Sequence, residues 1–128
     1  MDKNFYITTP IYYPSAKPHM GHAYSSIVAD FFARFKVIDG YEVHFLTGTD
    51  EHGQKIQKEA EKFNKDPLIF CDELSETFRS LTKTLNLSND DFIRTTEKRH
   101  HKSVVEIWNR LVKSGDIYLD KYSGWYSV

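Results

Sequence analysis

The segment Pro10–His22 joins a short apolar run to an amphipathic segment, and it limits the possible folds of this chain more than any other feature. The run Phe5–Thr9 before it is rich in aromatic and β-branched residues, which is typical of a buried strand. Prolines recur within the segment itself and favour a loop. From Met20 onward apolar residues recur at a spacing of four, which predicts a helix packed on a sheet through Ile27, Phe31 and Phe35, with Val28 and Phe32 beside them.

The next residues complete a strand–helix–strand unit. Asp39-Gly40 is a helix stop signal, and Glu42–Thr47 then alternates as a second strand does. Such a unit predicts parallel strands and an α/β fold of the Rossmann-like type, although no G-x-G-x-x-G follows the first strand. The segment Gly48–Gly53 follows the second strand, so we expect it to share one crevice with Pro10–His22 at the carboxyl ends of the strands.

Two more helices are predicted before the next strand. The first covers Gln54–Asn64, and the second begins with Asp66 as its cap and Pro67 in its first turn. The second helix carries an apolar stripe made of Cys71, Leu74, Phe78, Leu81 and Leu85. We therefore expect Cys71 to be a buried packing residue and not a reactive thiol.

The last part of the chain is expected to hold a short strand at Asp91–Thr95 and a helix that ends near Gly115. The core face of that helix is predicted at Val104, Trp108 and Leu111. The basic run Lys98–Lys102 fits either a solvated helix face or a contact to phosphate. Two short strands, Ile117–Leu119 and Trp125–Val128, are expected around Ser123-Gly124.

Composition narrows the class of protein. The chain has 128 residues, enough for one ordinary domain, with 17 basic and 18 acidic residues, so nothing in its net charge marks a nucleic-acid binder. Its single cysteine excludes an internal disulfide framework and a Cys-rich zinc site. No signal peptide and no apolar run of transmembrane length is visible, which predicts a cytoplasmic protein without a membrane partner.

The joint between the first loop and the first helix favours phosphate chemistry. A helix amino terminus presents unpaired N–H groups, and Gly21 lets a flat base or sugar approach the backbone there. His19 and His22 can share a helix face and donate hydrogen bonds to phosphoryl oxygens. Two other interpretations stay open at this point, namely that the histidines form a polar helix cap or a pair of metal ligands.

Two segments of the sequence carry a family resemblance. TTPIYYPSAKPHMGH resembles the signature loop of class I aminoacyl-tRNA synthetases, whose HIGH motif stands here as His19-Met20-Gly21-His22, with Met20 in place of isoleucine. Together with FLTGTDEHGQKIQKEA (Phe45–Ala60), it is similar to the methionyl-tRNA synthetase family of the bacterial type. The resemblance implies the amino-terminal half of a HUP-type Rossmann-like nucleotide-binding domain at 1–115, the start of an inserted connective domain at 116–128, and hence a fragment of a longer enzyme.

The resemblance also implies a reaction, the ATP-dependent ligation of methionine to its tRNA through methionyl-adenylate. It implies catalytic roles for His19 and His22, and ATP would be bound with Mg²⁺ by Tyr12, His19, Gly21 and His22. Methionine would be bound by Pro10, Ile11, Tyr13 and Asp50. Contacts to tRNA would lie mainly outside this chain, which also lacks the KMSKS loop, and zinc is not expected because Ser127 stands where zinc-binding relatives have cysteine.

Alternatives remain for the function and for one residue. The chain could instead be a small-molecule nucleotidyltransferase with an H-x-G-H loop, although such enzymes have no reason to carry Phe45–Ala60, or a non-catalytic module that binds a nucleotide or an amino acid. Asp50, which the resemblance places on the ammonium group of methionine, could instead cap the helix that follows it.

Overall fold

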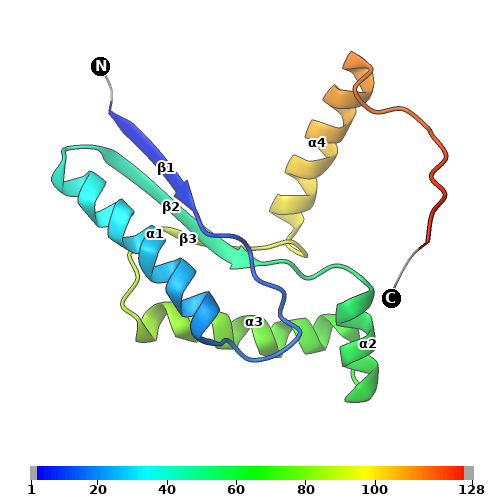
Figure 1. Ribbon diagram of the computed structural model, residues 1–128, viewed down its shortest axis with the longest axis horizontal. Coiled ribbons are helices and arrows are strands. Elements are labelled where there is room, and N and C mark those ends of the chain that lie inside the picture. The colour runs from blue at the N-terminus through cyan, green and yellow to red at the C-terminus, as the bar shows by residue number, and fades with distance from the viewer. Residues whose placement is uncertain (1–2, 126–128) are drawn as a thin grey trace. The chain divides into compact units, whose positions relative to one another are not determined.

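The computed structural model describes residues 3–125, and its first half is a strand–loop–helix–strand unit (Figure 1). This unit consists of β1 (Asn4–Thr8), α1 (Met20–Ile38) and β2 (Glu42–Thr49). It is followed by α2 (Gln54–Lys62), α3 (Pro67–Thr84), β3 (Asp91–Arg94) and α4 (Lys98–Ser114). The predicted strand Ile117–Leu119 is wrong, because those residues are irregular. Of the other predicted strand, Trp125 is irregular as well. Its remaining residues, 126–128, which include Ser127, lie outside the described residues.

The strands form a three-stranded parallel sheet in the order β1-β2-β3. Ile7 pairs with Phe45 across β1 and β2, and Thr47 pairs with Phe92 across β2 and β3. Each pair of neighbouring strands is connected through helices, as parallel pairing requires. The predicted α/β fold with a Rossmann-like parallel sheet is therefore confirmed.

Helices α1 and α3 pack against the same face of the sheet. Phe45 of β2 is fully buried against α1, and the Thr49 hydroxyl lies 3.1 Å from the Ser75 hydroxyl of α3. Side chains of alternate strand residues point to one side, so Phe45 and Thr49 mark a common face. On the other face Tyr6 stacks on His44 and is 61% exposed, so that face is accessible at this pair.

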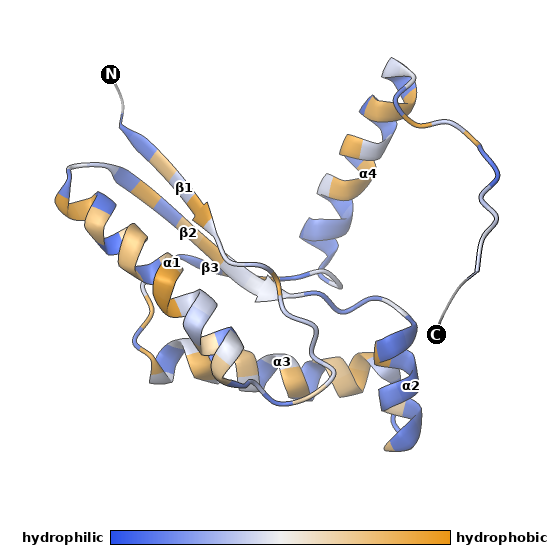
Figure 2. Cartoon of the chain, viewed as in Figure 1, coloured by the Kyte–Doolittle hydropathy of each residue, from blue (hydrophilic) through white to orange (hydrophobic). Residues whose placement is uncertain are grey.

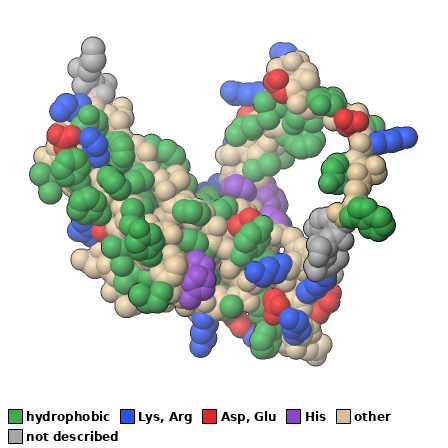
Figure 3. All heavy atoms as spheres, in the orientation of Figure 1, with side chains coloured by type: hydrophobic (Ala, Val, Ile, Leu, Met, Phe, Trp, Pro, Cys, Tyr) green, Lys and Arg blue, Asp and Glu red, His purple; other side chains and the backbone are tan. Residues whose placement is uncertain are grey.

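The predicted buried face of α1 is wrong. The helix places Ser26, Ala29 and Ala33 against the sheet, while the large apolar stripe is exposed, with Phe31 at 63%. Small side chains let a helix approach a sheet closely, and Phe45 fills the space that they leave. Orange segments mark apolar residues along α1 in Figure 2, and hydrophobic side chains gather over this helix in Figure 3.

A close backbone approach fixes the pairing of β2 with β3. Gly48 faces Ile93 in the register, and a Cβ atom on Gly48 would overlap the carbonyl oxygen of Ile93. Residue 48 therefore has to be glycine for the strands to lie this close.

A second cluster holds α2 on α3. Cys71 is buried there with Ile56, Ala60 and Phe70, as predicted for a packing residue. Burial and the nearby Glu51 charge raise the pKa of the Cys71 thiol to about 11, so it stays protonated at neutral pH.

The chain divides into two compact units, Met1–Glu97 and Lys98–Val128. In the second unit α4 buries none of its residues within the part of the chain that the structure describes, and Trp108 is 56% exposed. The predicted core face of that helix is therefore wrong. The predicted domain boundary near residue 115 stays a prediction. Among residues 3–125, no helix combines the length and the apolar character that crossing a membrane requires.

Candidate functional site

Tyr12 brings the two loops of the predicted site together. Its backbone N–H donates to the carbonyl of Gly48 at 3.0 Å, and its carbonyl accepts from the N–H of Asp50 at 2.9 Å. These bonds extend the pairing of β1 with β2 by an isolated bridge between Tyr12 and Thr49. The segment Pro10–His22 and the turn after β2 thus meet at the carboxyl end of the sheet, as the strand order predicts.

The side chain of Tyr12 packs against His22, one of the two histidines. Its hydroxyl donates to the carbonyl of His22 at 3.3 Å and lies 3.0 Å from the hydroxyl of Ser26. Its ring contacts the His22 ring with a centroid distance of 4.8 Å and stacks on Phe78. Tyr12 is only 8% exposed, so most of its side chain belongs to the core and one edge reaches the site.

The two histidines cap the helix that they begin. The Nδ1 atom of His19 accepts from the N–H of Gly21, and the Nδ1 atom of His22 accepts from the N–H of His19, both at 3.1 Å. Their rings stack with a centroid distance of 3.8 Å. A Cβ on Gly21 would lie 2.9 Å from the His19 ring, so this glycine makes room for that ring. The interpretation of the two histidines as a polar helix cap is therefore confirmed by these hydrogen bonds.

This capping fixes the tautomer of both rings. A neutral imidazole whose Nδ1 accepts a hydrogen bond carries its proton on Nε2. Both histidines therefore present an Nε2–H donor. Burial, and in second place the neighbouring His19, lower the pKa of His22 below its ordinary value of 6.5. His22 is accordingly a neutral donor at physiological pH.

Acid should weaken the cap at His22. The depressed pKa means that the folded chain favours neutral His22, so this contribution to stability is complete above about 6.5 and falls as pH drops through the lower folded pKa. Protonation would place a donor on Nδ1 opposite the N–H of His19. We expect the His22 ring to titrate below 6.5 in an NMR pH titration, and His22→Asn to remove this acid-side loss of stability. A midpoint above that value would contradict the assignment.

Asp50 lies half-buried in the turn after β2, and its carboxylate has no hydrogen-bonding or ionic partner among residues 3–125. The alternative that it caps the next helix is not observed. That cap is Gly53, and no side chain bonds to it. The carboxylate of Asp50 is thus free to bind a cation.

The neighbour of Asp50 forms a buried ionic network. The Glu51 side chain is 0% exposed and accepts from Arg94 through Nε at 2.7 Å and Nη2 at 3.0 Å. Further donors to it are the hydroxyls of Thr49, Ser75 and Thr96. Burial alone would raise the pKa of Glu51, but these hydrogen bonds, led by those from Arg94, hold it below its ordinary value. The network ties the turn after β2 to α3 and β3.

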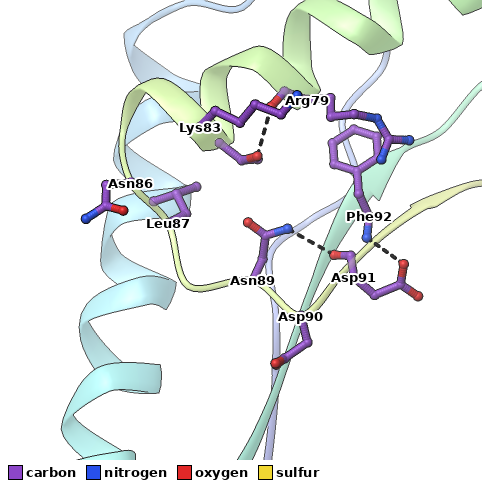
Figure 4. A pocket seen from close by; sticks show the side chains of 9 residues that line it. Arg79, Lys83, Asn86, Leu87, Asn89, Asp90, Asp91 and Phe92 are labelled. Atoms are coloured by element: carbon purple, nitrogen blue, oxygen red, sulfur yellow. Dashed lines mark hydrogen bonds between the residues drawn. The ribbon is translucent and has the colours of Figure 1, made fainter.

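Two of the cavities near the sheet lie at opposite ends of its strands. One of about 480 Å³ is lined by Ile11, Tyr12, Tyr13, His19 and His22 together with residues of α2 and the first loop. The predicted residues Pro10, Gly21 and Asp50 do not line it. The other, of about 680 Å³, lies at the amino end of β3, where Arg79 covers the ring of Phe92 at 4.6 Å (Figure 4).

We place the candidate site in the cavity of about 480 Å³. Ligands of open α/β sheets bind outside the carboxyl ends of the strands, and the histidine pair lies at that end. Among the described residues, no group of three or more His, Cys, Asp or Glu side chains could hold a metal ion.

Comparison with known proteins identifies the family. A sequence model of the family described as tRNA synthetases class I (M) matches residues 5–128. The chain belongs to this family. The match covers both signature segments, which argues against the small nucleotidyltransferase alternative.

Curated relatives agree with this assignment. Methionine--tRNA ligase 1 of Bacillus cereus is 58% identical over 127 residues, 99% of this chain and 19% of the relative. Methionine--tRNA ligase of Rickettsia bellii is 54% identical over 128 residues, 100% of this chain and 25% of the relative. The chain thus spans about a fifth to a quarter of the length of these relatives.

A solved structure agrees as well. Methionyl-tRNA synthetase of Mycobacterium tuberculosis, in complex with methionyl-adenylate, superimposes with a TM-score of 0.93. It is 50% identical, and the match covers 98% of this chain and 25% of that chain.

Proposed function

We propose that this chain is part of a methionyl-tRNA synthetase and supplies residues that bind ATP and methionine when the whole enzyme forms methionyl-adenylate. The observation that carries this proposal is the meeting, on Tyr12, of the H-x-G-H histidines with the Asp50 turn. It is supported by 50% identity to a synthetase solved with methionyl-adenylate.

The histidines would act on the nucleotide. A methionine carboxylate oxygen attacks the α-phosphorus of ATP, the bond to the bridging oxygen breaks, and pyrophosphate leaves with the electron pair. The transition state spreads negative charge over phosphoryl oxygens, which Nε2–H donors on His19 and His22 would stabilise. No proton has to move to either ring. Tyr12 would hold His22 in place, and Gly21, which has no side chain, would leave room for the His19 ring beside the nucleotide.

Methionine would lie beside the turn after β2. Its ammonium group would pair with the unpartnered carboxylate of Asp50, and Pro10, Ile11 and Tyr13 would contact its side chain. Tyr13 is half-exposed at the cavity wall, where an aromatic ring can contact a thioether for about 0.3–1.5 kcal/mol.

The other components follow from the reaction. Mg²⁺ would arrive with ATP, because it keeps several waters and binds nucleotides through phosphate oxygens. Transfer of methionine to tRNA would depend mainly on residues outside this chain. A cytoplasmic location, the absence of a membrane partner and the absence of zinc stay predictions.

A chimaera tests the proposed function. The 127 residues of this chain that match the Bacillus cereus ligase would replace the corresponding segment of that ligase, and methionine-dependent exchange of pyrophosphate into ATP would be measured. We expect exchange comparable to that of the parent ligase, and little by the isolated chain, which lacks a KMSKS loop. An inactive but folded chimaera that still binds ATP or methionine would support the non-catalytic binding module instead.

The role of Asp50 gives a prediction within that chimaera. Asp50→Asn keeps the size of the side chain but removes its charge, and a hydrogen bond to a charged group contributes about 1.5–3 kcal/mol. We expect the KM for methionine to rise about 10- to 100-fold while the KM for ATP stays within about twofold. The matched control is Asp66→Asn, which makes the same change at the exposed residue that caps the start of α3. An equal rise in both constants would contradict the ammonium role.

A further inference from the structure

Two lysines line the cavity that holds the histidine pair. Lys17 belongs to the loop before α1, and Lys55 belongs to the first turn of α2. Both are exposed at the cavity wall, and among the described residues neither Nζ atom has a hydrogen-bonding or ionic partner. Some lysines of the chain are paired, such as Lys62 of α2 with Glu59 at 2.7 Å.

The charged side chains of the cavity wall are all basic. Its ionisable groups are Lys17, Lys55, the two histidines and two tyrosines, and no carboxylate lines it. The cavity is therefore suited to an anion with several charges.

The backbone and the histidines cannot neutralise such an anion alone. The N–H of Gly21 is already taken by His19, and the N–H groups of His22 and Ala23 bond to the carbonyl of His19. The imidazoles are neutral donors in the capped state, so they bring no charge. The helix terminus supplies only a partial positive charge, so full charges to match several phosphates must come from side chains, and lysine is a common phosphate ligand.

We propose that Lys17 and Lys55 bind the β- and γ-phosphates of ATP from two walls of the cavity and hold the pyrophosphate that leaves. The identification of the anion as the nucleotide tail rests on the proposed function. The lysines bind the part of ATP that becomes the leaving group, while His19 and His22 donate hydrogen bonds to the α-phosphoryl group that reacts.

Binding of inorganic tripolyphosphate to this chain tests the lysines without catalysis. Lys17→Gln and Lys55→Gln should each weaken binding about five- to tenfold in an NMR titration, and the double variant more. Affinity of the unaltered chain should fall steeply with salt, and less steeply in the double variant. Lys58→Gln, on the same helix but outside the cavity wall, is the matched control and should leave binding unchanged. Failure of tripolyphosphate to shift residues of the cavity wall would overturn the proposal.

Kinetics of the chimaera separate this proposal from the proposed function. We expect Lys17→Gln and Lys55→Gln to raise the KM for ATP about five- to tenfold without changing the KM for methionine, and Lys→Arg variants to restore most of the loss. Exchange with an unchanged KM for ATP in both Gln variants would overturn the lysine proposal and leave the synthetase function intact. Lysine-dependent tripolyphosphate binding in a chain whose chimaera shows no exchange would support the anion site and reject the synthetase function.

Discussion

Replacing Arg94 with methionine should lower the free energy of unfolding by about 3–5 kcal/mol, because the change leaves the Glu51 carboxylate buried without its cation. Methionine fills much of the space of the arginine stem, so the loss reflects the missing charge and hydrogen bonds more than a cavity. Urea unfolding at neutral pH, followed by circular dichroism, measures the effect.

The matched control acts on the exposed side of the same arginine. Asp72 also pairs with Arg94 at 2.6 Å, but its side chain is 54% exposed, so Asp72→Asn should cost less than about 1 kcal/mol. A double variant, Arg94→Met with Glu51→Gln, should lose less free energy of unfolding than the sum of the two single changes. The reason is that glutamine leaves no buried charge without a partner. An Arg94→Met loss as small as that of Asp72→Asn would show that the buried pair contributes little.

His22→Asn in the chimaera should reduce pyrophosphate exchange about 100- to 1,000-fold, equivalent to about 2.7–4 kcal/mol in the transition state. The asparagine oxygen can take the position of Nδ1 and still accept from the N–H of His19, so the cap is kept while the Nε2–H donor is lost. Exchange rates and thermal unfolding measured on the same preparation separate the two effects.

Glutamine at the same position is the informative counterpart. Its amide reaches the position of Nε2 and restores a donor, but it leaves the N–H of His19 without its acceptor. We expect His22→Gln to retain more exchange than His22→Asn and to be less stable. If both variants exchange as fast as the parent chimaera, the imidazole of His22 has no part in the transition state.

Sequence reasoning succeeded where local patterns carry the information. The spacing of strand, helix and strand predicted parallel pairing, and the ends of Phe5–Thr9 and Glu42–Thr47 predicted which loops would meet. A motif of neighbouring residues such as His19-Met20-Gly21-His22 keeps its geometry through local bonds, so its place at a helix start could be predicted.

Other features depend on residues that meet only in the folded chain. Periodicity showed that α1 is amphipathic, but it could not show that Ala29 and Ala33, and not the large stripe, would contact the sheet. Glu51 and Arg94 are distant in the sequence and carry no motif that links them. The separate positions of Lys17 and Lys55 likewise concealed their common cavity.

Gly48 has a consequence for how this enzyme family can vary. Its register partner Ile93 directly precedes Arg94, while Thr49, Asp50 and Glu51 follow Gly48 along the chain. A larger residue at this position would have to push β3 outward and would carry the guanidinium away from its carboxylate. The missing side chain of Gly48 thus sets the position of the turn proposed to bind methionine, although Gly48 itself is not among the residues proposed to contact it.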